Sequence, residues 1–284
     1  MAGDGSGVGE AAVAASPGRP DWAPEGVDLS TPSAARAYDY ALGGAHSFAV
    51  DREFFRALEA ALPGARLILR ANRAFLHRAV RFMVEAGVRQ FLDLGSGIPT
   101  VGNVHEIAQR LVPETRVVYV DIDPVAVAHS RLILAGNDRA TAIQEDLRHA
   151  DAILGHPATR ALLDFDEPVG LILAAILHAV PDEDDPYGIM TGLRDVLSAG
   201  SYVAISHATA DSRPVEARAA EQVTKRTSTP GTLRTRAEVL RLFTGLDLVQ
   251  PGLVWTPQWR PEHPEDVGDH PERMVTYAGV GRRT

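Results

Sequence analysis

The amino-acid sequence predicts an α/β fold in which a doubly wound, mainly parallel sheet of seven strands has helices on both faces. Two observations carry this prediction. From residue 90 onward, short apolar runs alternate with segments of helical periodicity, which is typical of a parallel sheet covered on both sides. The first apolar run ends in the glycine turn Gly95-Ser96-Gly97, and doubly wound sheets bind nucleotide-like ligands at such a turn.

The first third of the chain has a different organisation. Residues 1–30 are rich in Ala, Gly, Pro and Ser without apolar periodicity, which predicts a disordered leader. Residues 31–88 are expected to form an N-terminal helical cap, and residues 89–284 the α/β domain. Within the cap, apolar residues at helical spacing predict helices at 33–42, 51–62 and 67–85.

The elements of the α/β domain follow from the same patterns. Strands are predicted at residues 91–94, 117–120, 141–144, 169–174, 202–206, 246–249 and 275–280. Helices are predicted between them, at residues 101–111, 125–134, 150–163, 184–197 and 235–243. The last two strands are joined by a proline-containing segment without a helical pattern, so we expect an antiparallel pair at the sheet edge.

Composition excludes several classes of function. The net charge of −9 argues against a general nucleic-acid or membrane-surface binder. The chain has no cysteine, which excludes disulfides and thiolate metal sites, and its histidines lack metal-ligand spacing, so no metal is expected. No apolar run is long enough to cross a bilayer. We expect a cytoplasmic protein with a small-molecule partner; the sequence leaves the oligomeric state open.

Acidic residues follow three successive strands. Asp93, Asp121 and Asp146 each lie at the carboxyl end of a predicted strand, and these ends meet at one edge of a parallel sheet. A carboxylate at position 121 can accept hydrogen bonds from both ribose hydroxyls of an adenosine. Asp146 is placed to accept one from the adenine amino group. Asp123, followed by Pro124, is expected to cap the next helix.

The glycine turn differs from a dinucleotide-binding fingerprint. It lacks the third glycine that such sites use for close packing of helix on strand, and Pro99 stands near the expected helix start. A site without a pyrophosphate to hold needs only close backbone approach to a smaller cofactor. The turn therefore favours S-adenosylmethionine over NAD.

These motifs resemble the class I S-adenosylmethionine-dependent methyltransferases, a Rossmann-like fold with an antiparallel last strand. The resemblance spans residues 65–284 and is carried by the motifs DLGSG (93–97), VDIDP (120–124), EDL (145–147) and LHAVPD (177–182). A narrower likeness, at residues 32–44, 51–53 and 71–76, is to the actinobacterial S-adenosyl methyltransferase family, long filed as a domain of unknown function. That family typically has a lysine soon after its paired glycines, where this chain has Ala45-His46-Ser47.

The resemblance implies a role for each motif residue. Asp121 would hold the ribose of the cofactor, and Asp93 would orient the glycine turn. The other expected cofactor residues are Gly95, Ser96 and Gly97 around the methionine moiety, Ile122 beside the ribose, Asp146 and Leu147 at the adenine, and Ala174 and Ala175 under the cofactor.

Further residues are also candidates, and three of them, Tyr38, Arg73 and His178, have alternative interpretations. Tyr38 is expected in a helical lid over the sulfonium, and Asn72 and Arg73 at the cofactor carboxylate; alternatively, Tyr38 packs on the domain and Arg73 lies on a solvated helix face. His178, just beyond the fourth strand, is the candidate general base. It could instead hydrogen-bond a loop carbonyl without taking part in chemistry. His207, after the fifth strand, lies at a comparable level.

Three functions therefore stay open at this point. The first is methyl transfer from S-adenosylmethionine to a small-molecule acceptor that enters between the lid and residues 208–232. The second is a sensor or partner-binding protein that binds the cofactor without catalysis, since a fold and a cofactor site do not establish a reaction. The third, an NAD-dependent oxidoreductase, is disfavoured by the missing third glycine.

Overall fold

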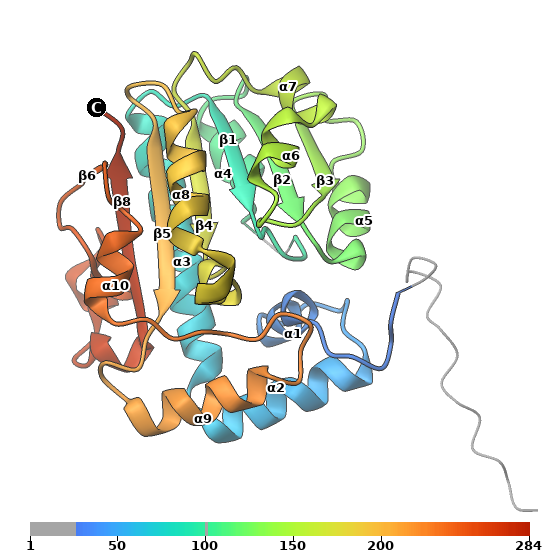
Figure 1. The fold of residues 1–284 in the computed structure, drawn as a ribbon, viewed down its shortest axis with the longest axis vertical. Coiled ribbons are helices and arrows are strands. Elements are labelled where there is room, and N and C mark those ends of the chain that lie inside the picture. Colours follow the sequence, from blue (N-terminus) through green and yellow to red (C-terminus); the bar gives the residue numbers. More distant parts are fainter. Residues whose placement is uncertain (1–26, 100–101) are drawn as a thin grey trace, which may run out of the picture.

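The computed structural model describes residues 27–99 and 102–284 (Figure 1). Most of the predicted leader, residues 1–26, lies outside the described residues, as does the predicted start of a helix at residue 101. In the described part, no helix combines the length and the apolar character that a membrane span requires.

The described strands form one eight-stranded sheet with the order β3-β2-β1-β4-β5-β8-β6, while β7 pairs with β8. Strands β1 to β5 are parallel and β6 to β8 are antiparallel to their neighbours. The predicted fold class is confirmed, with one strand more than expected because two-residue β7 is too short to give a pattern. The bounds are β1 Gln90–Leu94, β2 Arg116–Asp121, β3 Ala140–Gln144, β4 Gly170–Ala174, β5 Tyr202–Ala208, β6 Asp247–Leu248, β7 Val254–Trp255 and β8 Thr276–Arg282.

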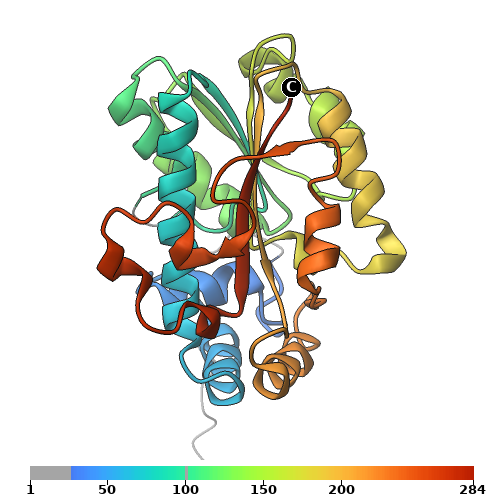
Figure 2. The ribbon, with the colours of Figure 1, turned by 90° about the vertical axis from the view of Figure 1, so that its left-hand side faces the viewer.

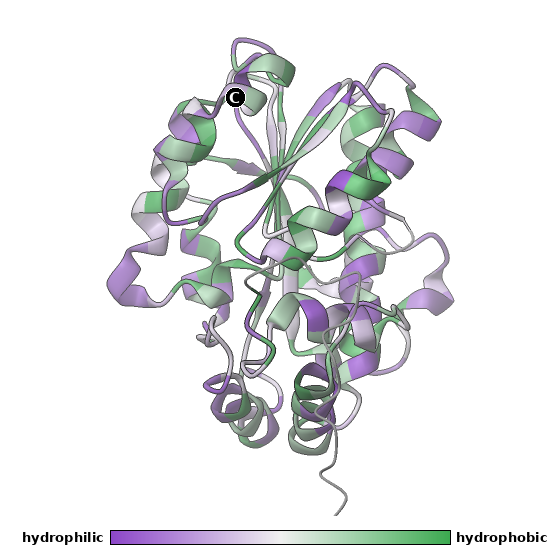
Figure 3. Cartoon of the chain, turned by 90° about the vertical axis from the view of Figure 1, so that its right-hand side faces the viewer, coloured by the Kyte–Doolittle hydropathy of each residue, from purple (hydrophilic) through white to green (hydrophobic). Residues whose placement is uncertain are grey.

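Helices cover both faces of the sheet, and a separate hydrophobic core lies under each layer (Figure 2). The long helices carry hydrophobic and hydrophilic residues together (Figure 3), as expected of helices with one buried side. One face is covered by α3 (Ala65–Glu85), α4 (Val104–Leu111) and α5 (Pro124–Ile133). The other is covered by α6 (Ala150–Gly155), α7 (Pro157–Leu162), α8 (Pro186–Asp195) and α10 (Arg236–Arg241).

Two helix predictions were wrong in detail. The single helix expected at residues 150–163 is two helices, because Pro157 lacks an N–H and keeps His156 extended, with φ −61° and ψ 133°. The segment 208–232, for which no helix was predicted, contains α9 (Pro214–Thr224). Short 3-10 helices η1 (Leu177–Ala179) and η2 (Asp182–Asp184) follow β4, and η3 (Thr256–Gln258), η4 (Pro264–Val267) and η5 (Pro271–Met274) lie before β8.

The helices α1 (Ala34–Ala41), α2 (Ala49–Ala61) and α9 lie beyond the carboxyl edge of the parallel strands (Figure 1). Helix α9 packs against α2 although the two are far apart in the sequence. The N-terminal cap and the 208–232 segment therefore cover the carboxyl edge of the parallel strands, where the predicted strand-end residues lie.

A buried ionic network fastens the cap to the α/β domain. Arg36 of α1 donates from Nε to Oδ2 of Asp51 on α2 at 2.8 Å, and its Nη1 lies 3.4 Å from Oδ2 of Asp123. The Ser33 hydroxyl also donates to Asp123. Asp123 caps α5 as expected, accepting from the Val125 N–H at 2.8 Å. Arg36 thus connects both cap helices to Asp123, the residue that caps α5.

Breaking this network is expected to destabilise the protein strongly. The Arg36 and Asp51 side chains are only 5% and 0% exposed, so Asp51→Ala leaves a buried guanidinium without its main partner. We expect the free energy of unfolding, measured with urea, to fall by about 3–5 kcal/mol. The control is Glu262→Ala, which breaks the exposed Arg81–Glu262 pair and is expected to change it by less than about 1 kcal/mol. Equal losses in the two variants would contradict this interpretation.

Candidate functional site

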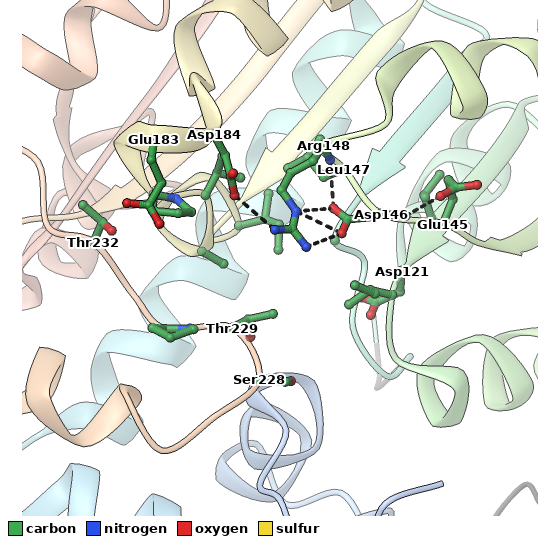
Figure 4. A pocket seen from close by; sticks show the side chains of 18 residues that line it. Asp121, Glu145, Asp146, Leu147, Arg148, Glu183, Asp184, Ser228, Thr229 and Thr232 are labelled. Carbon is green, nitrogen blue, oxygen red and sulfur yellow. Dashed lines mark hydrogen bonds and ion pairs between the residues drawn. The ribbon is translucent and has the colours of Figure 1, made fainter. Parts of the chain in front are cut away.

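A cavity of about 390 Å³ lies at the carboxyl edge of β1, β2 and β3 (Figure 4). The turn after β1 and the ends of β2 and β3 form one wall, and the segment after β4 and residues 228–232 form the others. Of the predicted site residues, the structure brings together here Gly95, Asp121, Ile122, Asp146 and Leu147. Residues not predicted also line it, among them Arg148, Glu183, Asp184, Ser228, Thr229 and Thr232.

The glycine turn is bare backbone with positive φ angles. Gly95 and Gly97 both have φ 68°, a region that favours glycine. A Cβ on Gly95 would lie 2.2 Å from Cγ1 of Ile176, whereas one on Gly97 would meet no described atom within 4 Å. The N–H groups of Gly95 and Ser96 donate to the Val120 carbonyl at 2.8 and 3.1 Å. The turn is therefore tied to β2 on one side and sterically open on the other.

Asp121 holds the turn in place. Its Oδ2 accepts from the Gly97 N–H at 2.7 Å, and its Oδ1 accepts from the Asp123 N–H at 2.8 Å. Burial raises the pKa of Asp121 to about 6, although these N–H donors lower it. Sequence reasoning gave this orienting contact to Asp93, but in the described residues the Asp93 carboxylate makes no hydrogen bond to the turn. Burial raises the pKa of Asp93 to about 7, against the opposing charge of Arg73.

Asp146 is paired with Arg148, which also bonds Asp184 on the other side of the cavity. Nε of Arg148 donates to both oxygens of Asp146 at 3.0 Å, and Nη1 donates to Oδ2 of Asp184 at 3.1 Å (Figure 4). The hydrogen bonds from Arg148 lower the pKa of Asp146. Arg148 thus connects the end of β3 to η2. Sequence reasoning missed it, because an arginine shortly after a strand has no distinguishing pattern.

Tyr38 and Asn72 are hydrogen-bonded to each other, and Asn72 also contacts Ser206 near the carboxyl end of β5. Asn72 Nδ2 donates to the Tyr38 hydroxyl at 3.1 Å, and that hydroxyl donates to the Leu69 carbonyl at 3.0 Å. Asn72 Oδ1 accepts from the Ser206 hydroxyl at 2.5 Å. Both polar groups of the Asn72 amide therefore have protein partners. The Ala175 N–H in turn donates to Oγ of Ser206 at 2.8 Å.

Arg73 lines a second cavity of about 680 Å³, between α3, the loop 42–46 and Asn103. Its Nη2 donates to Oδ1 of Asn103 at 2.9 Å, and its Nε is buried without a hydrogen-bond partner in the described residues. Its charge also acts on Asp93. The alternative interpretation, a solvated helix face, does not fit these surroundings.

His178 lies beside the 390 Å³ cavity but is not among the described residues that line it; Ala179 and Val180 are. Its ring meets that of His207 edge-on, with centroids 5.9 Å apart. Burial and the charge of Arg234 lower the pKa of His178 to about 4, so the imidazole is neutral near pH 7. Its Nδ1 is buried and has no hydrogen-bond partner in the described part of the chain.

Arg234 is a buried cation next to these two histidines. The sequence analysis did not identify it. Its side chain is 2% exposed. It donates to the carbonyls of Leu177 and Val180 at 3.0 and 2.9 Å, and to Nε2 of His207 at 3.0 Å. Burial lowers the pKa of His207 to about 3, with a further contribution from His178. Arg234 therefore fixes the segment after β4 to the end of β5. In residues 27–99 and 102–284, no group of three or more potential metal ligands comes together.

A doubly wound sheet with a glycine turn after β1 and carboxylates at the carboxyl ends of β1, β2 and β3 is the arrangement expected of a class I methyltransferase. The family model described as S-adenosyl methyltransferase matches residues 20–284. The chain therefore belongs to the S-adenosyl methyltransferase family; it is an S-adenosylmethionine-dependent methyltransferase, and S-adenosylmethionine is its cofactor. This confirms the resemblance stated from the sequence.

Solved structures agree with this assignment. A protein of Thermobifida fusca described as a candidate methyltransferase is 37% identical, with a TM-score of 0.88 over 93% of this chain and 100% of that one. A DUF574 family protein from Streptomyces avermitilis is 40% identical, with a TM-score of 0.87 over 90% and 99%. An O-methyltransferase family protein from Burkholderia thailandensis, at 15% identity, a TM-score of 0.51 and 81% and 60% coverage, shares the fold. No curated protein matches the chain significantly.

The two glycines of the turn are expected to respond differently to substitution. Gly97→Ala places a methyl group in open space, so only the positive φ is unfavourable, at about 1 kcal/mol. Gly95→Ala adds a clash with Ile176 and is expected to lower the free energy of unfolding by clearly more than Gly97→Ala does. Urea denaturation of both variants checks this, and indistinguishable midpoints would contradict the steric argument.

Proposed function

We propose that the protein transfers the methyl group of S-adenosylmethionine to a small-molecule acceptor, with the adenosine bound in the cavity at the carboxyl edge. The observation that carries this proposal is Asp121. Its buried carboxylate lies at the end of β2, touches the glycine turn and lines the cavity. Asp146 lies at the end of the neighbouring strand, on the same cavity.

Each predicted cofactor residue has a place in this proposal. Asp121 accepts from the ribose hydroxyls with Ile122 beside it, and Asp146 and Leu147 border the adenine. The open side of Gly95, Ser96 and Gly97 takes the methionine moiety, above Ala174 and Ala175. Arg73, whose charge lowers the pKa of Asp93, matches the carboxylate of the methionine end, and Asp93 matches its ammonium. Tyr38 and Asn72 support the site from below through their mutual hydrogen bond.

The acceptor is proposed to enter between the N-terminal cap and residues 228–232. Ser228, Thr229 and Thr232 line the cavity there and can hydrogen-bond a polar acceptor. Methyl transfer is an in-line displacement on an already activated sulfonium, so holding the two reactants in line supplies much of the rate. The origin of two similar proteins in Thermobifida and Streptomyces supports an actinobacterial source, while the cytoplasmic location stays a prediction.

The affinity for S-adenosylmethionine is expected to depend on Asp121 and on pH. Because burial raises the pKa of Asp121 to about 6, protonation removes its negative charge and turns one acceptor oxygen into a hydroxyl donor as the pH falls through this value. Calorimetry should therefore show wild-type affinity falling between about pH 8 and about pH 5. Asp121→Asn should bind at least about tenfold more weakly at neutral pH, because it loses a charged hydrogen-bond acceptor.

The Asp121→Asn variant should lose part of the pH dependence and keep the part that comes from Asp93, whose pKa is about 7. The control is Asp151→Asn on the exposed surface of α6, which should bind like wild type. An unchanged pH profile in Asp121→Asn would overturn the assignment of this residue, and no binding to the wild-type protein would overturn the cavity proposal itself.

His178 as general base stays a prediction, and its test is turnover. With labelled S-adenosylmethionine and an extract of the source organism, His178→Gln should slow label transfer at least about tenfold while leaving cofactor affinity nearly unchanged. Since the pKa of His178 is about 4, its base form predominates throughout, and the wild-type rate should have no acidic limb from this group between about pH 5.5 and 8.

Equal rates in wild type and His178→Gln would remove His178 from the chemistry and leave positioning as the main source of rate. Tight binding of the cofactor without label in any product would favour the non-catalytic sensor.

A further inference from the structure

A chain of hydrogen bonds runs from Tyr38 of the cap through the buried residues Asn72 and Ser206 to the turn after β4. We propose that Ser206 and Asn72 are positioning residues, which hold Ala175 in a left-handed backbone conformation and thereby fix the turn on which the cofactor rests. This inference deepens the proposed function and rests on it, because the contact of Ala175 with the cofactor belongs to that proposal.

Ala175 has a conformation that alanine does not adopt by itself. Its φ is +56°, and in the described residues the other non-glycine positions with positive φ are Asp185, Arg260 and Val275. An L-residue in this region brings its Cβ close to the following carbonyl oxygen. Such residues persist where their surroundings hold them, and they cluster at functional sites. Gly97 also has a positive φ, but glycine adopts it without steric cost. Position 175 has the same kind of conformation with an alanine.

Ser206 supplies the hold on Ala175. Strands β4 and β5 run in register with Ala174 opposite Ser206. The Ala175 N–H donates to Oγ of Ser206 at 2.8 Å and to the Ser206 carbonyl at 3.2 Å. Ser206 is fully buried, so water cannot replace these acceptors. If the turn relaxed, the Ala175 N–H would lose both partners inside the protein, which is unfavourable.

Asn72 sets the direction of the Ser206 hydroxyl. A serine hydroxyl can rotate and can act as donor or acceptor. Here its proton points to Oδ1 of Asn72 at 2.5 Å, which leaves a lone pair for the Ala175 N–H. The Asn72 amide is in turn oriented by Tyr38, whose hydroxyl accepts from Nδ2 at 3.1 Å. The hydrogen bonds therefore run in one consistent sense from the β4 turn through β5 and α3 to α1.

In this arrangement both ends of the Asn72 amide are engaged by protein partners, whereas the sequence placed this residue at the cofactor carboxylate. The hydrogen bonds also connect the cap to the turn after β4, because Tyr38 belongs to α1. A displaced cap would remove the group that orients Asn72, and with it the orientation of the Ser206 hydroxyl.

The chain contains a matched control for this role. Ser201, just before β5, is also fully buried, and its Oγ accepts from the Val169 N–H at 3.0 Å. This bond joins the same two strands as the Ser206 bond does, but at their amino ends, away from the cavity. Loss of either hydroxyl removes one hydrogen bond between the β4 and β5 segments and one further side-chain bond, to Asn72 from Ser206 and to Ser198 from Ser201. A general effect on stability should therefore be comparable for the two variants.

The test measures S-adenosylmethionine affinity by calorimetry in Ser206→Ala, Ala175→Gly, the double variant and Ser201→Ala. Ser206→Ala should weaken binding by about fivefold to thirtyfold, the range set by the left-handed penalty of alanine. Ser201→Ala should stay within about twofold of wild type. Ala175→Gly should restore the affinity of Ser206→Ala to near that of Ala175→Gly alone, because glycine adopts this conformation without help.

A double variant that binds as weakly as Ser206→Ala would overturn the proposal, since a lost packing or ligand contact is not repaired by glycine. Equal losses in Ser201→Ala and Ser206→Ala would also overturn it. If the wild-type protein does not bind S-adenosylmethionine, the proposed function fails, and hydrogen exchange of the residue 175 amide decides the positioning role. Faster exchange in Ser206→Ala but not in Ser201→Ala supports it, and unchanged exchange in both contradicts it.

Discussion

The Asp121 carboxylate accepts one hydrogen bond from the glycine turn and another from Asp123, and the remaining parts of the site are arranged around this pair of bonds. The first bond fixes the open backbone after β1. The second joins the end of β2 to the residue that caps α5. Asp123 is also the point where Ser33 and Arg36 attach the cap. Three segments from different parts of the sequence therefore depend on one side chain for their relative positions.

Keeping this carboxylate buried has a consequence for stability. The folded pKa of Asp121 is about 6, above its ordinary value of 3.8, so between these values the folded state binds the proton more tightly than the unfolded state does. The contribution of Asp121 to stability therefore decreases as the pH rises through this window and is least favourable above it, where the carboxylate is charged. The two hydrophobic cores must offset this cost at neutral pH. Such a balance is common where a site is organised for binding rather than for stability.

Local patterns in the sequence were sufficient for much of the fold. Apolar periodicity identified the long helices and most strands, and the strand-end position of Asp121 and Asp146 placed both on one cavity. The two-residue strand β7 and helix α9 gave no pattern of that kind. Pro157 was a signal that could have divided the helix expected at residues 150–163.

The missed site residues depend on contacts between distant parts of the chain. Arg234 bonds Leu177 across 57 residues, and Ser206 bonds Asn72 across 134. No periodicity or motif reports such pairs. For the same reason the orienting contact of the glycine turn was assigned to Asp93, which is near in sequence, and not to Asp121, which comes from the next strand.

Arg148 and Arg36 represent two kinds of counterion. Arg36 is buried between its acids, whereas Arg148 is 47% exposed and bridges Asp146 and Asp184. Exchange of an exposed partner requires little free energy. Under the proposed function, the adenine amino group would replace only this exposed contact at Asp146, and Arg148 would keep Asp184. In the proposed complex, adenine would therefore exchange one hydrogen-bond donor for another at Asp146, while Arg148 stays paired with Asp184.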